Sequence, residues 1–142
     1  MSYNALRSGR YSATGNVYHV TTITRNRAPT FGDIHAGRVL VRELMSAQTD
    51  GLAQTLCFVV MPDHLHWLLT LENGTLAGLT KRVKARSARA LGRPTWQANF
   101  HDHAVRSEES LRDVARYIVA NPLRAGLVAR IGDYPLWDSI WL

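Results

Sequence analysis

The sequence contains a single cysteine, Cys57, and no hydrophobic run long enough to cross a membrane. One cysteine excludes an internal disulfide, and its place in an apolar stretch is typical of a buried thiol in a reducing compartment. A membrane-spanning helix needs about 20 apolar residues, whereas the longest apolar runs here, 56–61 and 67–71, have the length of strands. Residues 1–20 also lack the apolar centre of a signal peptide. We therefore expect a cytoplasmic protein that does not bind membranes.

Linkers, low-complexity tracts and long-period repeats are also absent from the 142 residues. The composition, with 46% hydrophobic and 20% charged residues, excludes a disordered or fibrous chain because both values are ordinary for globular proteins. A chain of this length is typical of one domain. We predict a single domain over residues 1–142, with a basic arm at 1–16 and a C-terminal tail at 123–142.

Acidic residues are few, 11 against 17 basic ones, and only two of the 17 are lysine. The planar arginine side chain matches phosphate geometry and stacks on bases, so this bias indicates nucleic acid as a partner. A genome rich in G and C gives the same bias. The distribution is more informative, because six basic residues and no acid lie between residues 81 and 93. We predict that this cluster binds DNA, with a solvated helix face as the alternative. Its members are Lys81, Arg82, Lys84, Arg86, Arg89 and Arg93.

Apolar periodicity and turn signals predict four strands and three helices. The strands are expected over residues 17–25, 52–61, 64–71 and 100–106. Asp33, Thr75 and Ser107 are placed as N-caps of the helices, and Pro122 limits the last helix to about residue 120. This order is typical of an α+β, ferredoxin-like split βαβ fold. We expect a four-stranded antiparallel sheet with two helices on one face and the extra C-terminal helix against the other.

Two histidines, His64 and His66, flank Leu65 in the third predicted strand. Strand side chains alternate between faces, so both imidazoles point to one side of the sheet while Leu65 points into the opposite layer. Two imidazoles at this spacing can hold one divalent metal ion. Two half-buried histidines without a metal give the same pattern, so the spacing alone leaves both interpretations open.

A tyrosine and an asparagine, Tyr117 and Asn121, lie four residues apart on the flank of the last predicted helix. Residues at this spacing project together. If the helix packs on the open face of the sheet, the phenol and the amide oxygen approach the two imidazoles. Taken singly, Tyr117 is also typical of the edge of a core, and Asn121 of a helix C-cap before proline.

Longer motifs surround these residues. VVMPDHLHWLL contains His64 and His66, and ARYIVANPLRAGLV contains Tyr117. With YHVTTITRNR, WQANFHDHAVRS and YPLWDS, they make the chain resemble the HUH single-tyrosine transposases over residues 18–137. Within that group it is most similar to the REP-associated tyrosine transposases. The combination of MPDHLH with YIVANPLRAGLV is specific for this family.

The resemblance implies a transposase: a metal-dependent endonuclease and strand transferase for single-stranded DNA, acting at imperfect palindromes or hairpins. It implies that His64 and His66 hold Mg²⁺ or Mn²⁺, with Asn121 as a further ligand, although Asn is shorter than the Gln of relatives. It also implies that Tyr117 is the nucleophile, which gives a 5′-phosphotyrosine and a free 3′-OH. A monomer or a homodimer, associated with the nucleoid, is compatible with it.

A second histidine pair, His101 and His103, surrounds Asp102 in the fourth predicted strand. The family motif has an apolar residue at the middle position. We therefore assign this pair to structure or DNA contact, with metal ligation by one of them as the alternative. Arg25 and Arg27 are further predicted DNA contacts.

Two other functions are compatible with the sequence. One is a module of the same fold that binds nucleic acid without catalysis. The other is a ferredoxin-like metal hydrolase of a small phosphodiester, in which Tyr117 is incidental. A covalent adduct between protein and DNA distinguishes the transposase from both.

Overall fold

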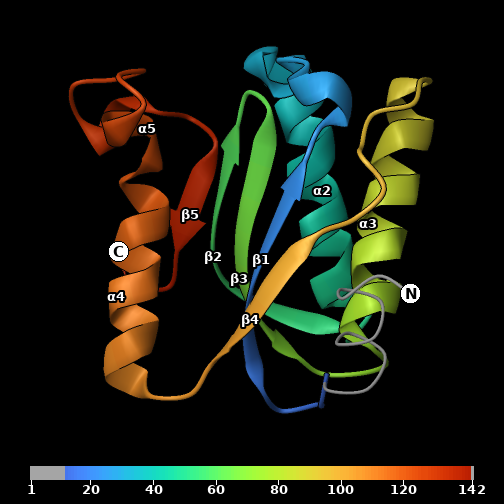
Figure 1. The fold of residues 1–142 in the computed structure, drawn as a ribbon, viewed down its shortest axis with the longest axis vertical. Helices are drawn as coiled ribbons and strands as arrows, with labels where there is room; N and C mark the ends of the chain where they lie inside the picture. The colour runs from blue at the N-terminus through green and yellow to red at the C-terminus, as the bar shows by residue number, and fades with distance from the viewer. Residues whose placement is uncertain (1–11, 142) are drawn as a thin grey trace.

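The structure is a computed structural model that describes residues 12–141, so most of the expected basic arm lies outside the described residues (Figure 1). None of the helices in this part of the chain is long and apolar enough to pass through a bilayer. The elements are β1 (Val17–Ile23), η1 (Arg25–Arg27), η2 (Thr30–Gly32), α2 (Ile34–Thr49), β2 (Ala53–Met61), β3 (His64–Leu71), α3 (Leu76–Leu91), β4 (His101–Val105), α4 (Glu108–Val119), α5 (Asn121–Arg124), η3 (Ile131–Asp133) and β5 (Trp137–Ser139).

The strands form one antiparallel sheet in the order β4-β1-β3-β2-β5. The first four strands and the helices α2 and α3 have the ferredoxin-like arrangement expected from the sequence. The expected number of strands is corrected from four to five, because β5 pairs with the outer edge of β2 through Cys57–Ser139 and Val59–Trp137. Three residues of mixed polarity carry no alternation signal, so this strand depends on tertiary contacts.

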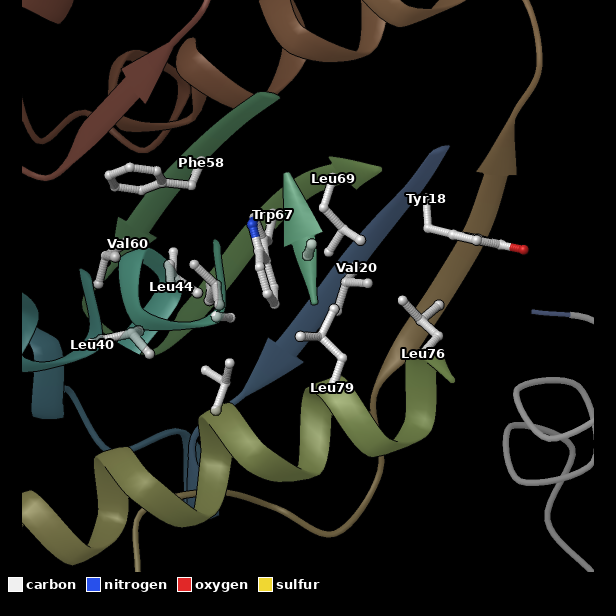
Figure 2. Close-up of a cluster of buried hydrophobic side chains, with 14 of the residues drawn as sticks. Tyr18, Val20, Leu40, Leu44, Phe58, Val60, Trp67, Leu69, Leu76 and Leu79 are labelled. Atoms are coloured by element: carbon white, nitrogen blue, oxygen red, sulfur yellow. The ribbon is translucent and has the colours of Figure 1, made fainter. Parts of the chain in front are cut away.

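The helices α2 and α3 cover one face of the sheet, and α4 lies on the other side with α5 at its end (Figure 1). The layer under α2 and α3 holds the larger apolar cluster, in which Trp67, Leu69 and Val20 of the sheet meet Leu40 and Leu79 of the helices (Figure 2). All five side chains are 3% exposed or less. Removing this much apolar surface from water is the main stabilisation of the domain.

The opposite face is apolar only where α4 lies. Ile118 and Ala115 of α4 pack with Val59, Cys57 and Leu68 of the central strands. The helix contacts β2, β3 and β5. Beyond Val17 and Val105, which belong to this cluster, β1 and β4 carry His19, Thr21, His101 and His103 on the same face, and the candidate site lies there.

Side-chain caps begin the three long helices where the sequence places them. Asp33, Thr75 and Ser107 each accept a hydrogen bond from a backbone N–H in the first turn of the helix that follows. Gly92 ends α3 with a φ of 73°, a left-handed conformation that glycine adopts without steric cost. The helix α4 ends at Val119, close to the boundary predicted from the following proline.

Candidate active site

Strand alternation in β3 places two imidazoles on the α4 side of the sheet. His64 and His66 share this face with Leu68, whereas Leu65 and Trp67 belong to the apolar cluster under α2 and α3. The centroids of the His64 and His66 rings are 4.9 Å apart, and the rings are nearly perpendicular. This is the common face that the sequence predicted for the pair.

Asp63 fixes the ring of His64. The Nδ1–H of His64 donates to Oδ1 of Asp63 over 2.7 Å, so the lone pair of His64 is on Nε2. Burial acts to raise the pKa of Asp63, but the hydrogen bonds from His64 and Arg27 outweigh it and hold that pKa below its usual value. A histidine that donates one ring N–H to a carboxylate is typical of metal ligands.

His66 has two polar neighbours from β1. Its Nδ1 lies 3.0 Å from Nε2 of His19 and 3.1 Å from Oγ1 of Thr21. Burial, and then the charges of nearby groups that include His19 and Arg124, lower the pKa of His66 to about 3. The ring is therefore neutral at pH 7, as metal ligation requires. In the tautomer that fits this role, Nδ1–H donates to a β1 acceptor and Nε2 carries the lone pair.

The third imidazole next to the pair is His19, which the sequence analysis did not select. His19 is 8% exposed, and burial together with the charge of His103 lowers its pKa to about 4. Its ring lies 5.1 Å from that of His66 and 5.0 Å from that of His103. His103 thus contacts His19 rather than the pair itself, and His101 is exposed at the edge of the sheet.

Tyr117 reaches the histidines from α4. Its ring centroid is 6.3 Å from that of His66, in an edge-on arrangement, and the side chain is 55% exposed. The guanidinium carbon of Arg124 lies 3.9 Å from the centre of the Tyr117 ring, and its Nη2 donates to the Tyr117 carbonyl over 2.7 Å. The phenol is therefore held between a histidine and an arginine while its surface stays open to a substrate.

Asn121 begins α5, one turn after the tyrosine. Its Nδ2 atom is buried and has no hydrogen-bond partner among the described residues. The oxygen and nitrogen of an amide are assigned from their partners, so rotating this side chain would bring Oδ1 to the same place. A buried amide atom without a partner fits a ligand position that a metal ion or a substrate would satisfy.

Within residues 12–141 no three His, Cys, Asp or Glu side chains are grouped to hold one metal ion. His64 and His66 nonetheless fit a divalent ion, because the Asp63 bond leaves Nε2 of His64 available and the low pKa keeps His66 neutral. Further ligands have to be of another kind: the amide of Asn121, water or a phosphate oxygen. This set suits an ion that keeps several oxygen ligands, such as Mg²⁺ or Mn²⁺.

Part of the basic cluster on α3 is used inside the protein. Arg82 forms an ion pair with Asp50 at the end of α2, and Arg86 forms one with Glu43, 2.8 Å between Nε and Oε1. Both pairs join α3 to α2 on the side of the sheet away from the histidines. The sequence predicted these arginines as DNA contacts, and their present partners are carboxylates.

Lys84 has a similar internal role. Its Nζ donates to the carbonyl oxygens of residues 97–99, and burial lowers its pKa. Lys81, Arg89 and Arg93 are exposed and form no ion pair within the described chain. Of the six predicted DNA contacts on and after α3, these three are therefore the ones whose charge is open to solvent and has no carboxylate partner in the described chain.

Arg25 and Arg27 lie in η1, after β1. Nη1 of Arg27 donates to Oδ2 of Asp63 over 3.0 Å, so Arg27 shares this carboxylate with His64. Asn26 and Arg27 have φ values of 56° and 53°, a left-handed conformation that costs free energy in residues other than glycine. This turn brings a cation to the rim of the histidine site.

A groove of about 610 Å³ lies away from the histidines, between α3 and residues 94–100. It is lined mainly by apolar atoms, including those of Trp96 and Phe100. Trp96 is held by a ring contact with Phe31 and by a hydrogen bond to Ser87, and it packs on the larger core cluster. The groups able to do chemistry lie on the other face of the sheet from this groove.

The sequence analysis did not select four residues that surround the histidine pair and Tyr117. They are His19, Thr21, Asp63 and Arg124. His19 and Thr21 alternate in the same predicted strand, which places them on one face. Asp63 directly precedes His64 in the first motif. Arg124 follows Tyr117 by seven residues in the second motif. Position in the motif was thus an available signal, whereas pairing of β1 with β3 was not.

Comparisons with known proteins give two main similarities, and no family model matches the chain. In sequence it is 27% identical over 129 residues to the REP-associated tyrosine transposase of Escherichia coli, covering 89% of this chain and 78% of that protein. In structure it is similar to a REP-associated tyrosine transposase bound to a REP hairpin, with a TM-score of 0.80 and 27% identity. The match covers 90% of this chain and 79% of that one. A solved structure from Deinococcus radiodurans, 24% identical with a TM-score of 0.56 over 78% of this chain and 93% of that one, supports the fold alone.

In sequence and in its α+β fold, the chain is thus similar to transposases. Within that class, the relatives that it matches are the REP-associated tyrosine transposases, in both sequence and structure. The resemblance seen in the two motifs is therefore confirmed by comparisons that cover about nine-tenths of the chain.

Proposed function

We propose that the protein cuts and joins single-stranded DNA next to hairpins, with Tyr117 as the nucleophile and a divalent ion held by His64 and His66. One observation carries the proposal: Tyr117 of α4 lies edge-on to His66 of β3, with 6.3 Å between the ring centroids. The two residues are far apart in the sequence. This contact supports the proposal because the fold places the phenol of α4 beside an imidazole of β3.

The reaction that fits these groups is a transesterification. The Tyr117 oxygen attacks the scissile phosphorus, the bond from phosphorus to the 3′ oxygen breaks, and the products are a 5′-phosphotyrosine and a 3′-OH. The phenol proton passes to solvent, and the leaving 3′ oxygen takes up one proton. A bound divalent ion would polarise the phosphate and offset its developing negative charge.

The second step reverses the first with another strand end. A DNA 3′-OH attacks the phosphotyrosine, and the Tyr117 oxygen leaves with its electron pair. A phenol with a pKa of about 10 is a far better leaving group than an aliphatic alcohol, so the bond energy of the phosphodiester is kept in the intermediate. Joining therefore needs no ATP.

The hairpin partner is proposed from the relative that is bound to a REP hairpin. Backbone contacts supply most of the affinity for DNA. Lys81, Arg89 and Arg93 are exposed cations of the α3 region that form no ion pair among the described residues, and they lie on the layer away from the histidines. We expect a DNA strand that contacts both the histidine site and these cations to pass the β4 edge of the sheet, where His101 and His103 are exposed.

The test is to incubate the protein with hairpin oligonucleotides that carry single-stranded flanks, in Mg²⁺ or Mn²⁺. We expect an adduct that survives denaturation, with the nucleotide on the peptide containing Tyr117 by mass spectrometry. Tyr117→Phe removes only the hydroxyl and should reduce adduct formation on the order of 1,000-fold or more, while hairpin affinity stays within threefold.

Tyr134→Phe is the matched control, because that hydroxyl donates to the Val60 carbonyl inside the fold rather than facing substrate. It should form the adduct at the wild-type rate. An adduct on another tyrosine would contradict the proposal. Hairpin binding without any adduct would indicate a DNA-binding module instead of an enzyme.

A further inference from the structure

We propose that Arg124 is a second catalytic residue, whose guanidinium binds a non-bridging oxygen of the scissile phosphate beside Tyr117. The inference rests on the proposed function, since it requires that Tyr117 attacks a phosphate. It assigns a role to a residue that the motif analysis did not select, and it can fail while the proposed function holds.

The placement of Arg124 relative to the nucleophile is well defined. Arg124 closes the short helix α5, whose direction returns its side chain to α4. The guanidinium carbon lies 3.9 Å from the centre of the Tyr117 ring, and Nη2 donates to the Tyr117 carbonyl over 2.7 Å. Two contacts with the same residue fix the planar group over the phenol. Only one of its five N–H donors has a partner in the described chain, so the others are available to a substrate.

The charge of Arg124 is also available. Within residues 12–141, six other arginines lie within 4 Å of a carboxylate, whereas Arg124 forms no ion pair. The six are Arg27, Arg82, Arg86, Arg112, Arg116 and Arg130. If Arg124 served only to join α5 to α4, its hydrogen bond to the Tyr117 carbonyl oxygen would be sufficient, and its charge would have no further role. An unneutralised guanidinium beside a nucleophile is suited to a phosphate, which it binds through its fork of donors.

Arg124 and His66 lie on the same open surface. The charge of Arg124 is near enough to disfavour protonation of the His66 imidazole, and the Tyr117 ring lies beside both groups. A phosphate in line with the Tyr117 oxygen and above His66 is therefore within reach of the guanidinium. Donors placed where negative charge develops stabilise the transition state more than the bound substrate.

The first measurement is the rate of adduct formation in a single turnover at saturating hairpin. For Arg124→Gln we expect a loss of about 100-fold or more, with Arg124→Lys recovering part of it through its charge. Hairpin affinity and melting temperature should stay close to wild type. Arg116→Gln is the matched control, since Arg116 is exposed on α4 next to the tyrosine and pairs with Asp113. Its rate should stay within threefold of wild type.

The second measurement separates contact with the phosphate from positioning of the phenol. The scissile phosphate is replaced by a methylphosphonate, which removes one negatively charged oxygen. If Arg124 binds that oxygen, the loss caused by Arg124→Gln should shrink from about 100-fold to less than about fivefold on one diastereomer of this substrate. An equal loss on both substrates would show that Arg124 acts only through Tyr117 and would overturn the inference.

The two proposals fail in different ways. A wild-type rate for Arg124→Gln, with the adduct still on Tyr117, overturns the role of Arg124 alone. Absence of an adduct in the wild-type protein, or an adduct that persists in Tyr117→Phe, overturns the proposed function and the role of Arg124 with it.

Discussion

The two faces of the sheet are built by the same strands but carry opposite kinds of side chain. In β3 the residues under α2 and α3 include Trp67 and Leu69, each 1% exposed or less. The alternate residues, His64 and His66, face α4 and are only partly buried. One face is closed by two long helices, whereas the other is closed by α4 over part of its width.

This difference separates stability from chemistry. The closed face buries a continuous apolar cluster, and none of the buried residues that form this cluster is a histidine, a carboxylate or a basic residue. On the partly covered face, the His66 ring contacts those of His19 and His64, and the Tyr117 ring stays accessible. Partial cover lowers the pKa values of two histidines, His19 and His66, without hiding the proposed nucleophile. Changes on the two faces should therefore give different kinds of defect.

The largest effect is expected from the histidine face. His66→Ala or His64→Ala should reduce metal-dependent cleavage on the order of 100-fold or more, because the remaining imidazole holds the ion weakly. Hairpin affinity should stay within a few fold, since phosphate contacts provide most of it. Single-turnover cleavage at increasing Mn²⁺ measures the first effect and fluorescence anisotropy the second. Cleavage at the wild-type rate in both variants would exclude this metal site.

On the closed face the expected defect is one of stability. Leu69→Ala removes a fully buried side chain and should lower the free energy of unfolding by about 2–5 kcal/mol. Denaturant titration measures the loss. Below the unfolding transition, cleavage per folded molecule should equal that of the wild type. A specific loss of cleavage in the folded variant would contradict the separation of the two faces.

Acid should destabilise the metal-free protein through the histidine face. The pKa is about 3 for His66 and about 4 for His19, and both return to about 6.5 on unfolding. The unfolded chain therefore binds more protons below pH 6.5, so stability is unchanged above that pH and falls as the pH drops toward 4. We expect a loss of about 2–3 kcal/mol for each of the two histidines over this interval, measured by denaturant titration. His19→Gln should show a shallower slope, and an unchanged slope would count against this explanation.

The smallest effect concerns the cations of α3. Replacing Lys81, Arg89 and Arg93 by Gln should weaken hairpin binding about threefold to tenfold and lower the salt dependence of log K by up to about 2. Replacing Arg82 and Arg86 instead should leave the salt dependence unchanged and cost about 1 kcal/mol of stability, because these two form ion pairs with α2. Equal salt slopes for the two sets would show that the DNA lies elsewhere.

Most of the fold follows from local sequence signals. The caps at Asp33, Thr75 and Ser107 and the turn at residues 62–63 mark where elements begin and end, and alternation in β3 assigns its two faces. The strand β5 was not predicted, because its three residues have no pattern of their own. It forms only because the tail lies beside the β2 edge.

The candidate site was predicted in part. His64, His66, Tyr117 and Asn121 follow from spacing and from the two motifs, and their roles remain proposals. The neighbour His19 was not found, because its contact with His66 depends on how β1 pairs with β3. Spacing within one segment cannot report a contact between two strands.

The basic cluster on α3 shows the opposite limitation. A run of cations without acids in the sequence indicates an open patch. In the structure, acids from another helix, Asp50 and Glu43, neutralise Arg82 and Arg86. Charge density along the chain therefore overstates charge on the surface whenever a neighbouring element supplies the counter-charge.

The pairing of β5 has a consequence for solubility. The β2 edge exchanges backbone hydrogen bonds with the tail on both sides of β5, from Val60 to Leu136 and from Ile140 to Leu56. Without these partners, an apolar strand would present a row of unpaired backbone groups, which is a template for pairing with another molecule. Deleting residues 136–142 should therefore produce a chain that self-associates through β2, and any tag or fusion added after the tail has to leave this edge covered.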